Sequence, residues 1–167
     1  IFFFFLGAFI ANVIVESLAR RNVRYSYTVP ILIESFILFL VAYFGSVWIN
    51  SAPNLLAFLL LFAMGLQNSL VTVISNSIVR TTHLTGLFTD LGIELSQLFF
   101  FKQRSQRQQL KASIRLHISI IGSFFTGGIV SGVFYSQIGI QTLAIAGLIL
   151  LFGISLSRVR FYYLKTT

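Results

Sequence analysis

The sequence predicts an all-α integral membrane protein with five transmembrane helices, one re-entrant or interfacial half-helix and an inverted repeat. Three observations support this class. The chain of 167 residues is 56% apolar and 10% charged, with a mean hydropathy of +0.90, whereas soluble domains carry about 25% charged residues. Apolar runs of membrane-spanning length recur along the chain, and basic residues gather at their ends. Composition and pattern together indicate a chain that lies in a bilayer.

Five apolar runs are long enough to span a hydrocarbon core of about 30 Å, which takes about 20 helical residues. They are residues 1–19, 27–50, 55–74, 116–135 and 138–157. Pro30 falls in the first turn of the second run, where its missing N–H costs little. The sequence "NSAPN" at 50–54 predicts a tight turn between two spans.

The run at residues 84–101 differs from these five because it carries Asp90 and Glu94, while Gly86 and Gly92 weaken it as a helix. The positive-inside rule predicts how it lies. If it enters and leaves on one side, all twelve Lys and Arg residues fall on the cytoplasmic side; if it crosses, the four before it and the eight after it lie on opposite sides. We therefore expect a re-entrant or interfacial segment, with Ile1 outside and Thr167 in the cytoplasm.

Two segments resemble each other and predict an inverted repeat. "FFLGAFIANV" (4–13) and "FFTGGIVSGV" (124–133) share a Phe pair, a following Gly and further small residues, and they run in opposite directions across the predicted membrane. The expected division is residues 1–50 as the end of a first repeat with two spans, and 51–167 as a second repeat with spans 55–76, 116–135 and 138–157 and the re-entrant segment 79–101. The alternative is two ordinary packing helices, because small residues four apart let helix backbones approach closely.

The candidate polar site combines the charged and polar side chains of the apolar runs. It comprises Arg80, His83, Thr85, Asp90, Glu94, Glu34, Gln67 and Asn68. A helix from His83 puts Asp90 and Glu94 on one polar face, which predicts a cavity lining with Arg80 or a coupling ion as partner. The alternative is an amphipathic helix on the cytoplasmic surface with its acids in water.

The other polar groups also allow two interpretations. A carboxylate two turns into a span, as at Glu34, is costly and functional by default, but it could equally be protonated or extend toward the interface. Gln67 and Asn68 either line the site or form hydrogen bonds between helices. His117 is expected at the interface, beside Arg115.

Several function classes are excluded by composition. With no Cys and two His, the chain cannot build a disulfide framework or a structural zinc site. No hydrolase, transferase or phosphate-loop motif occurs, so no enzyme is expected. The basic residues anchor apolar runs instead of forming a stripe, so the expected partners are the lipid bilayer and other membrane subunits, and no nucleic acid. The sequence identifies no cofactor.

"AMGLQNSL" (63–70) and "VRTTHLTGLFTDLG" (79–92) resemble the YoaK-type bacterial membrane proteins, a family of unknown function, and the likeness extends over nearly the whole chain. The resemblance implies the inner (plasma) membrane of a bacterium. It also implies a "TGN"-like motif before Ile1 that echoes "LTG" (84–86), so N-terminal residues and half of any symmetric site are expected to be missing. It implies no established activity.

Two functions remain after these exclusions. The first is a small-solute transporter or channel built on an inverted repeat. The second is a non-transporting accessory or structural subunit of a larger membrane complex, with pigment or lipid bound along its Phe-rich faces as a variant. Polar residues 80–97 facing a wet pocket would favour transport.

Overall fold

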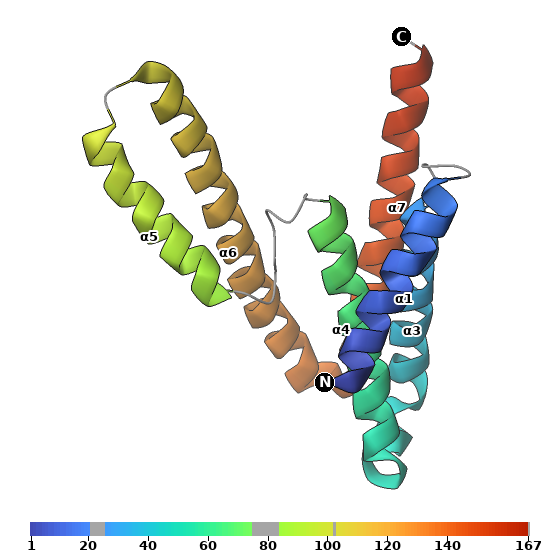
Figure 1. Ribbon diagram of the computed structural model, residues 1–167. Helices are drawn as coiled ribbons and strands as arrows, with labels where there is room; N and C mark the ends of the chain where they lie inside the picture. Colours follow the sequence, from blue (N-terminus) through green and yellow to red (C-terminus); the bar gives the residue numbers. More distant parts are fainter. Residues whose placement is uncertain (21–25, 75–83, 102, 167) are drawn as a thin grey trace.

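The computed structural model describes residues 1–20, 26–74, 84–101 and 103–166, and within these ranges the chain is helical without any strand (Figure 1). The elements are α1 (Phe2–Ala19), α3 (Thr28–Ser51), α4 (Pro53–Ile74), α5 (Leu84–Phe100), α6 (Arg104–Ile138), the short 3₁₀ helix η1 (Gly139–Gln141) and α7 (Thr142–Thr166). The all-α class is confirmed.

The helices form two parts that diverge from a common end. α1, α3, α4 and α7 lie together in a bundle, in which α1 packs on α4, α4 on α3 and α3 on α7. α5 packs on α6 in a hairpin that leans away from the bundle (Figure 1). α6 joins α7 through η1, at the end of the molecule where the N-terminus also lies, and Gly139 makes this turn with φ +61°, a backbone conformation that favours glycine.

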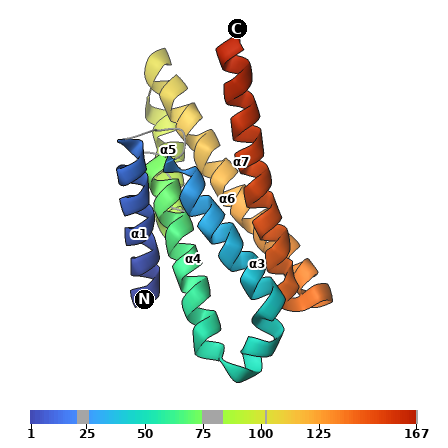
Figure 2. The same ribbon diagram turned by 90° about the vertical axis from the view of Figure 1, so that its right-hand side faces the viewer.

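The contact between α1 and α4 depends on one glycine in each helix. A Cβ added to Gly7 would lie 2.1 Å from the carbonyl oxygen of Phe62, and a Cβ on Gly65 would lie 2.1 Å from that of Phe4. The two helices run in the same direction (Figure 2). The contact is reciprocal, because the glycine of each helix lies against a Phe carbonyl oxygen of the other. Small residues permit this backbone approach in lipid.

The α3–α4 hairpin supplies most of the apolar core. A buried cluster of six residues joins α1, α3 and α4: Ala11, Ile37, Val41, Leu56, Ala63 and Leu66. On its other side α3 meets η1 and α7, where Gly45 faces the side chain of Ile140 and Gly147 faces the ring of Phe39. The bundle is thus layered α1, α4, α3, α7.

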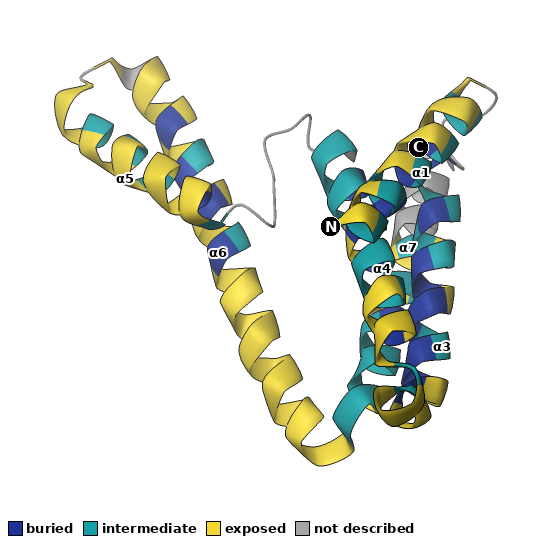
Figure 3. Ribbon diagram, turned by 60° about the horizontal axis from the view of Figure 1, so that its bottom comes forward, coloured by how far each residue is buried: buried dark blue, intermediate teal, exposed yellow. Residues whose placement is uncertain are grey.

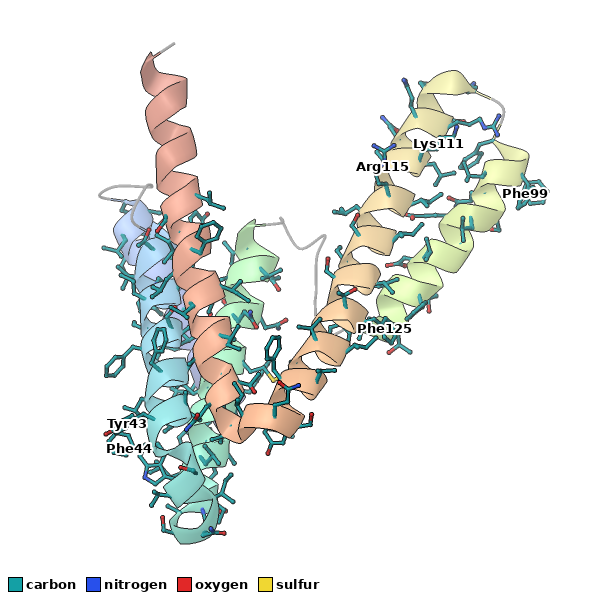
Figure 4. All side chains as sticks on the ribbon, turned by 180° about the vertical axis from the view of Figure 1, so that it is seen from behind. Tyr43, Phe44, Phe99, Lys111, Arg115 and Phe125 are labelled. Carbon is teal, nitrogen blue, oxygen red and sulfur yellow. The ribbon has the colours of Figure 1, made fainter. Side chains whose placement is uncertain are left out.

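Four helical stretches of the described chain are long and apolar enough to cross a membrane. They are Phe2–Ala19, Thr28–Ser51, Pro53–Val73 and Ser105–Leu156. Their outer surfaces are strongly apolar; Tyr43 and Phe44, for example, project away from the bundle (Figure 4). Contiguous exposed apolar surface on this scale is typical of lipid contact, so the fold is that of a membrane-embedded protein.

The structure does not support the inverted repeat. Gly7 of the first copy packs on α4, whereas Gly127 and Gly128 of the second copy have no atom within 4 Å of an added Cβ. Residues 122–137 of α6 are all exposed (Figure 3). The two segments therefore lack equivalent partners within the described chain, although their sequences are alike. The division of the chain at residues 50 and 51 stays a prediction.

Candidate functional site

The α5–α6 hairpin is held by an apolar stripe with polar groups set into it. On α5, Leu87, Leu91, Glu94 and Leu98 recur every three or four residues, so they share the face that meets α6. On α6 the residues at the same spacing are Leu110, Ile114, His117 and Ile121, all of them buried. Glu94 and His117 each take a place that the pattern would give to an apolar side chain.

Glu94 bridges two side chains of α6. Its Oε2 lies 2.9 Å from Nδ1 of His117, and the hydroxyl of Ser113 donates a hydrogen bond to its Oε1. The His117 side chain is 7% exposed and that of Glu94 is 17% exposed. Which of the two atoms donates in this contact depends on the tautomer of the imidazole: a ring N–H at Nδ1 would donate to the carboxylate oxygen. We call Glu94, Ser113 and His117 the hairpin cluster.

The geometry of the hairpin cluster is that of an ion-pair or proton-handling group. Ser113 bonds to the carboxylate and not to the imidazole, so the serine is not set up as the nucleophile of a Ser-His-acid triad. Within the part of the chain that the structure describes, no group of three or more His, Cys, Asp or Glu residues could hold a metal ion. What the cluster can do is hold and transfer a proton between Glu94 and His117.

The structure places Asp90 and Glu94, which the sequence predicts on one polar face of α5, in different surroundings. Asp90 is exposed, while Glu94 turns toward α6 and shares its face with the leucines. The reason is that Glu94 finds two hydrogen-bond partners on α6, which favours the side of the helix that α6 covers. Thr85 is exposed, and its carbonyl accepts a hydrogen bond from Thr89. Arg80 and His83 lie outside the described residues.

His117 is a partner of Glu94, a role that goes beyond its expected place at the interface. The sequence pattern contains a sign of this role: Leu110, Ile114 and Ile121 form an apolar stripe at helical spacing, and His117 falls on that stripe. Ser113 lies one turn before His117, at the spacing that lets both reach one acceptor.

The other predicted site residues lie in the bundle, apart from the hairpin cluster (Figure 1). Glu34 is 4% exposed, and its Oε2 has no hydrogen-bond partner among the described residues. Gln67 is exposed and Asn68 is half-buried; the backbone carbonyl of Asn68 accepts a hydrogen bond of 2.7 Å from Thr72. The structure therefore divides the candidate residues into a hairpin cluster and a separate buried carboxylate.

Comparison with known proteins gives one family. The family model described as "Protein of unknown function (DUF1275)", to which the YoaK-type proteins belong, matches residues 1–156. No curated protein and no solved structure matches the chain. The expectation that residues are missing before Ile1 finds no support in the family match. Because the match covers more than half of the sequence, the chain belongs to the DUF1275 family, whose function is unknown.

Proposed function

We propose that the protein is a multi-pass transporter or channel for a small solute in the inner (plasma) membrane of a bacterium. The observation that carries this proposal is the hairpin cluster, in which Glu94 and His117 pair on a surface that is otherwise apolar. Ionisable groups inside a membrane protein are costly, and they mark ion, proton and substrate pathways. An anchoring role alone would not require buried ionisable side chains.

The dimensions of the helices favour five crossings. The fourth apolar stretch has 52 residues and as one straight helix would be about 78 Å long, more than twice a hydrocarbon core of about 30 Å. The turn at Gly139 divides it, so that α6 and α7 each cross once, in addition to α1, α3 and α4.

The contacts of α5 favour a segment that enters the bilayer from the cytoplasmic side and returns. Phe88 near its start meets Phe125 of α6, with ring centroids 6.5 Å apart, in the apolar part of that helix. Its other end lies toward the basic part of α6, where Figure 4 shows Lys111, Arg115 and Phe99. A returning α5 would put all twelve basic residues of the sequence on one side, and the positive-inside rule favours that side, together with the C-terminus, as cytoplasmic.

The proposal is tested by a solute-accumulation screen in cells that lack the full-length protein or express it. For any solute that accumulates, Glu94→Gln is expected to lower uptake by about 100-fold or more, because a positioned proton-transfer group contributes roughly 10²–10⁴-fold to a rate. Asp90→Asn is the matched control, since it removes one charge from the same helix at an exposed position. Unchanged uptake by Glu94→Gln, in protein that is still inserted, would contradict the role of the hairpin cluster.

One observation favours the second function, an accessory subunit of a larger membrane complex. The glycines of α6 at 127, 128 and 132 have no neighbour within 4 Å of an added Cβ, and small residues on a lipid-facing helix allow another helix to approach. A single Gly128→Cys variant in native membranes tests it. Cross-linking to a different membrane protein, together with no uptake of any solute, would favour the subunit over the transporter.

A further inference from the structure

Glu34 is the one buried ionisable side chain in the described part of the bundle. It lies on α3 among buried Pro30, Ile37 and Val41, which follow the same helix face at spacings of three and four. In the α3–α4 hairpin, Glu34 and Leu70 are each eighteen residues from Ala52 (52 − 34 and 70 − 52), so a buried leucine lies at the same level of α4. The carboxyl group is therefore in an apolar setting.

No charged partner comes from the described side chains of the helices that pack on α3. α4, η1 and the Thr142–Leu156 part of α7 contain no charged residue or histidine. α1 has Glu16, and Arg20 follows its last turn, but both are exposed. The neighbouring Ser35 is buried with its hydroxyl unpartnered, yet it projects about 100° away around the helix and cannot share a site with Glu34.

An ionised carboxylate in such a place is unfavourable by several kcal/mol unless a cation or a proton neutralises it. Hard metal cations take about six oxygen ligands, and the described surroundings of Glu34 hold no cluster of acidic or histidine ligands. A proton needs only the carboxylate itself. Glu34 also lies six residues after Thr28, about 9 Å along the helix from its start, which is close to the cytoplasmic end of the bundle in the proposed orientation.

We propose that Glu34 is a proton-binding site inside the bundle, which exchanges its proton with water on the cytoplasmic side. This inference rests on the proposed function, and it identifies protons as the ions to which transport is coupled. The hairpin cluster and Glu34 then have different roles: Glu94 and His117 pair with each other, whereas Glu34 binds its proton without a partner among the described residues.

Two measurements on the purified full chain test this proposal. Dicyclohexylcarbodiimide enters apolar regions and reacts with protonated carboxyl groups: the acid O–H adds across a C=N bond and the acyl group then shifts to nitrogen, so the product retains all atoms of both reactants. At neutral pH we expect mass spectrometry to find this adduct on Glu34, which is buried among apolar side chains, and not on Glu16 and Asp90, which are exposed. Infrared spectroscopy should show a protonated carboxyl band that is lost in Glu34→Gln and kept in the control Glu16→Gln.

Absence of both the adduct and the band at neutral pH would overturn the proposal. The labelling needs no variant, so it does not depend on whether Glu34→Gln folds. The labelling is also independent of the uptake screen. If Glu34 is protonated and uptake is unchanged in Glu94→Gln, the result supports the proton site at Glu34 and contradicts a role of the hairpin cluster in transport. If uptake is lost in Glu94→Gln and Glu34 is not protonated, the result supports the role of the hairpin cluster and contradicts the proton site at Glu34.

Discussion

Gly7→Ala is expected to separate α1 from α4 and to destabilise the bundle by at least about 3 kcal/mol, the upper part of the range for overpacking. The added Cβ would lie 2.1 Å from the Phe62 carbonyl oxygen. That oxygen belongs to the backbone, so no side-chain rotation relieves the clash and the helices themselves must move. Gly65→Ala should have a similar effect, because the contact is reciprocal.

The measurement is the midpoint of unfolding in denaturing detergent, with unfolding monitored by gel filtration or by intrinsic fluorescence. Gly122→Ala is the matched control: it lies on α6 with nothing within 4 Å of an added Cβ. It should be neutral, or stabilising by about 0.5–1 kcal/mol, because Ala favours helix over Gly. If Gly7→Ala and Gly122→Ala unfolded at the same midpoint, the close α1–α4 contact would be wrong.

Glu94→Ala is expected to loosen the α5–α6 hairpin by about 1–3 kcal/mol, because it leaves His117 and Ser113 partly or fully buried without their acceptor. Asp90→Ala removes an exposed carboxylate from the same helix and should stay within about 0.5 kcal/mol of the wild type. Hydrogen exchange of the backbone amides in α5 reports the difference.

A triple variant separates the structural from the functional role of the cluster. Glu94→Leu, Ser113→Ala and His117→Phe together replace all three polar groups with apolar ones, which can be nearly neutral for stability. We expect the triple variant to recover protection of α5 while uptake stays lost. Recovery of uptake would show that the cluster only holds the hairpin together.

Much of the fold could be predicted from the sequence because span length is set by the bilayer. The runs at 1–19 and 55–74 match Phe2–Ala19 and Pro53–Ile74 to within two residues. α6 is longer than the predicted span at 116–135 and begins at Arg104. A span predicted from hydropathy ends where basic residues begin. The helix itself extends further, because Leu110 and Ile114 lie four residues apart and are buried on the face that meets α5.

Span length and hydropathy could not predict which helix packs against each predicted helix face. The small residues predict that Gly7 lies on a packing face, and the likeness to residues 124–133 predicts equivalent partners for the two segments. In the structure Gly7 packs on Phe62 of α4, whereas residues 122–137 are exposed. A local pattern shows which face of a helix packs, not which helix packs on it. For the same reason the sequence marked Glu94 as a site residue without identifying His117, twenty-three positions later, as its partner.

The most direct test of the account is the sidedness of two single cysteines, Ser51→Cys and Gln106→Cys. The sequence has no Cys, so each substitution introduces the only thiol. Ser51 ends α3 and Gln106 lies in the first turn of α6, so α4 and α5 lie between them. With α4 crossing and α5 returning to the side it entered, a membrane-impermeant maleimide added to intact cells should label Ser51→Cys and should reach Gln106→Cys only after the cells are opened. Labelling of both from outside would mean that α5 crosses the membrane, and would contradict the re-entrant hairpin on which the proposed site depends.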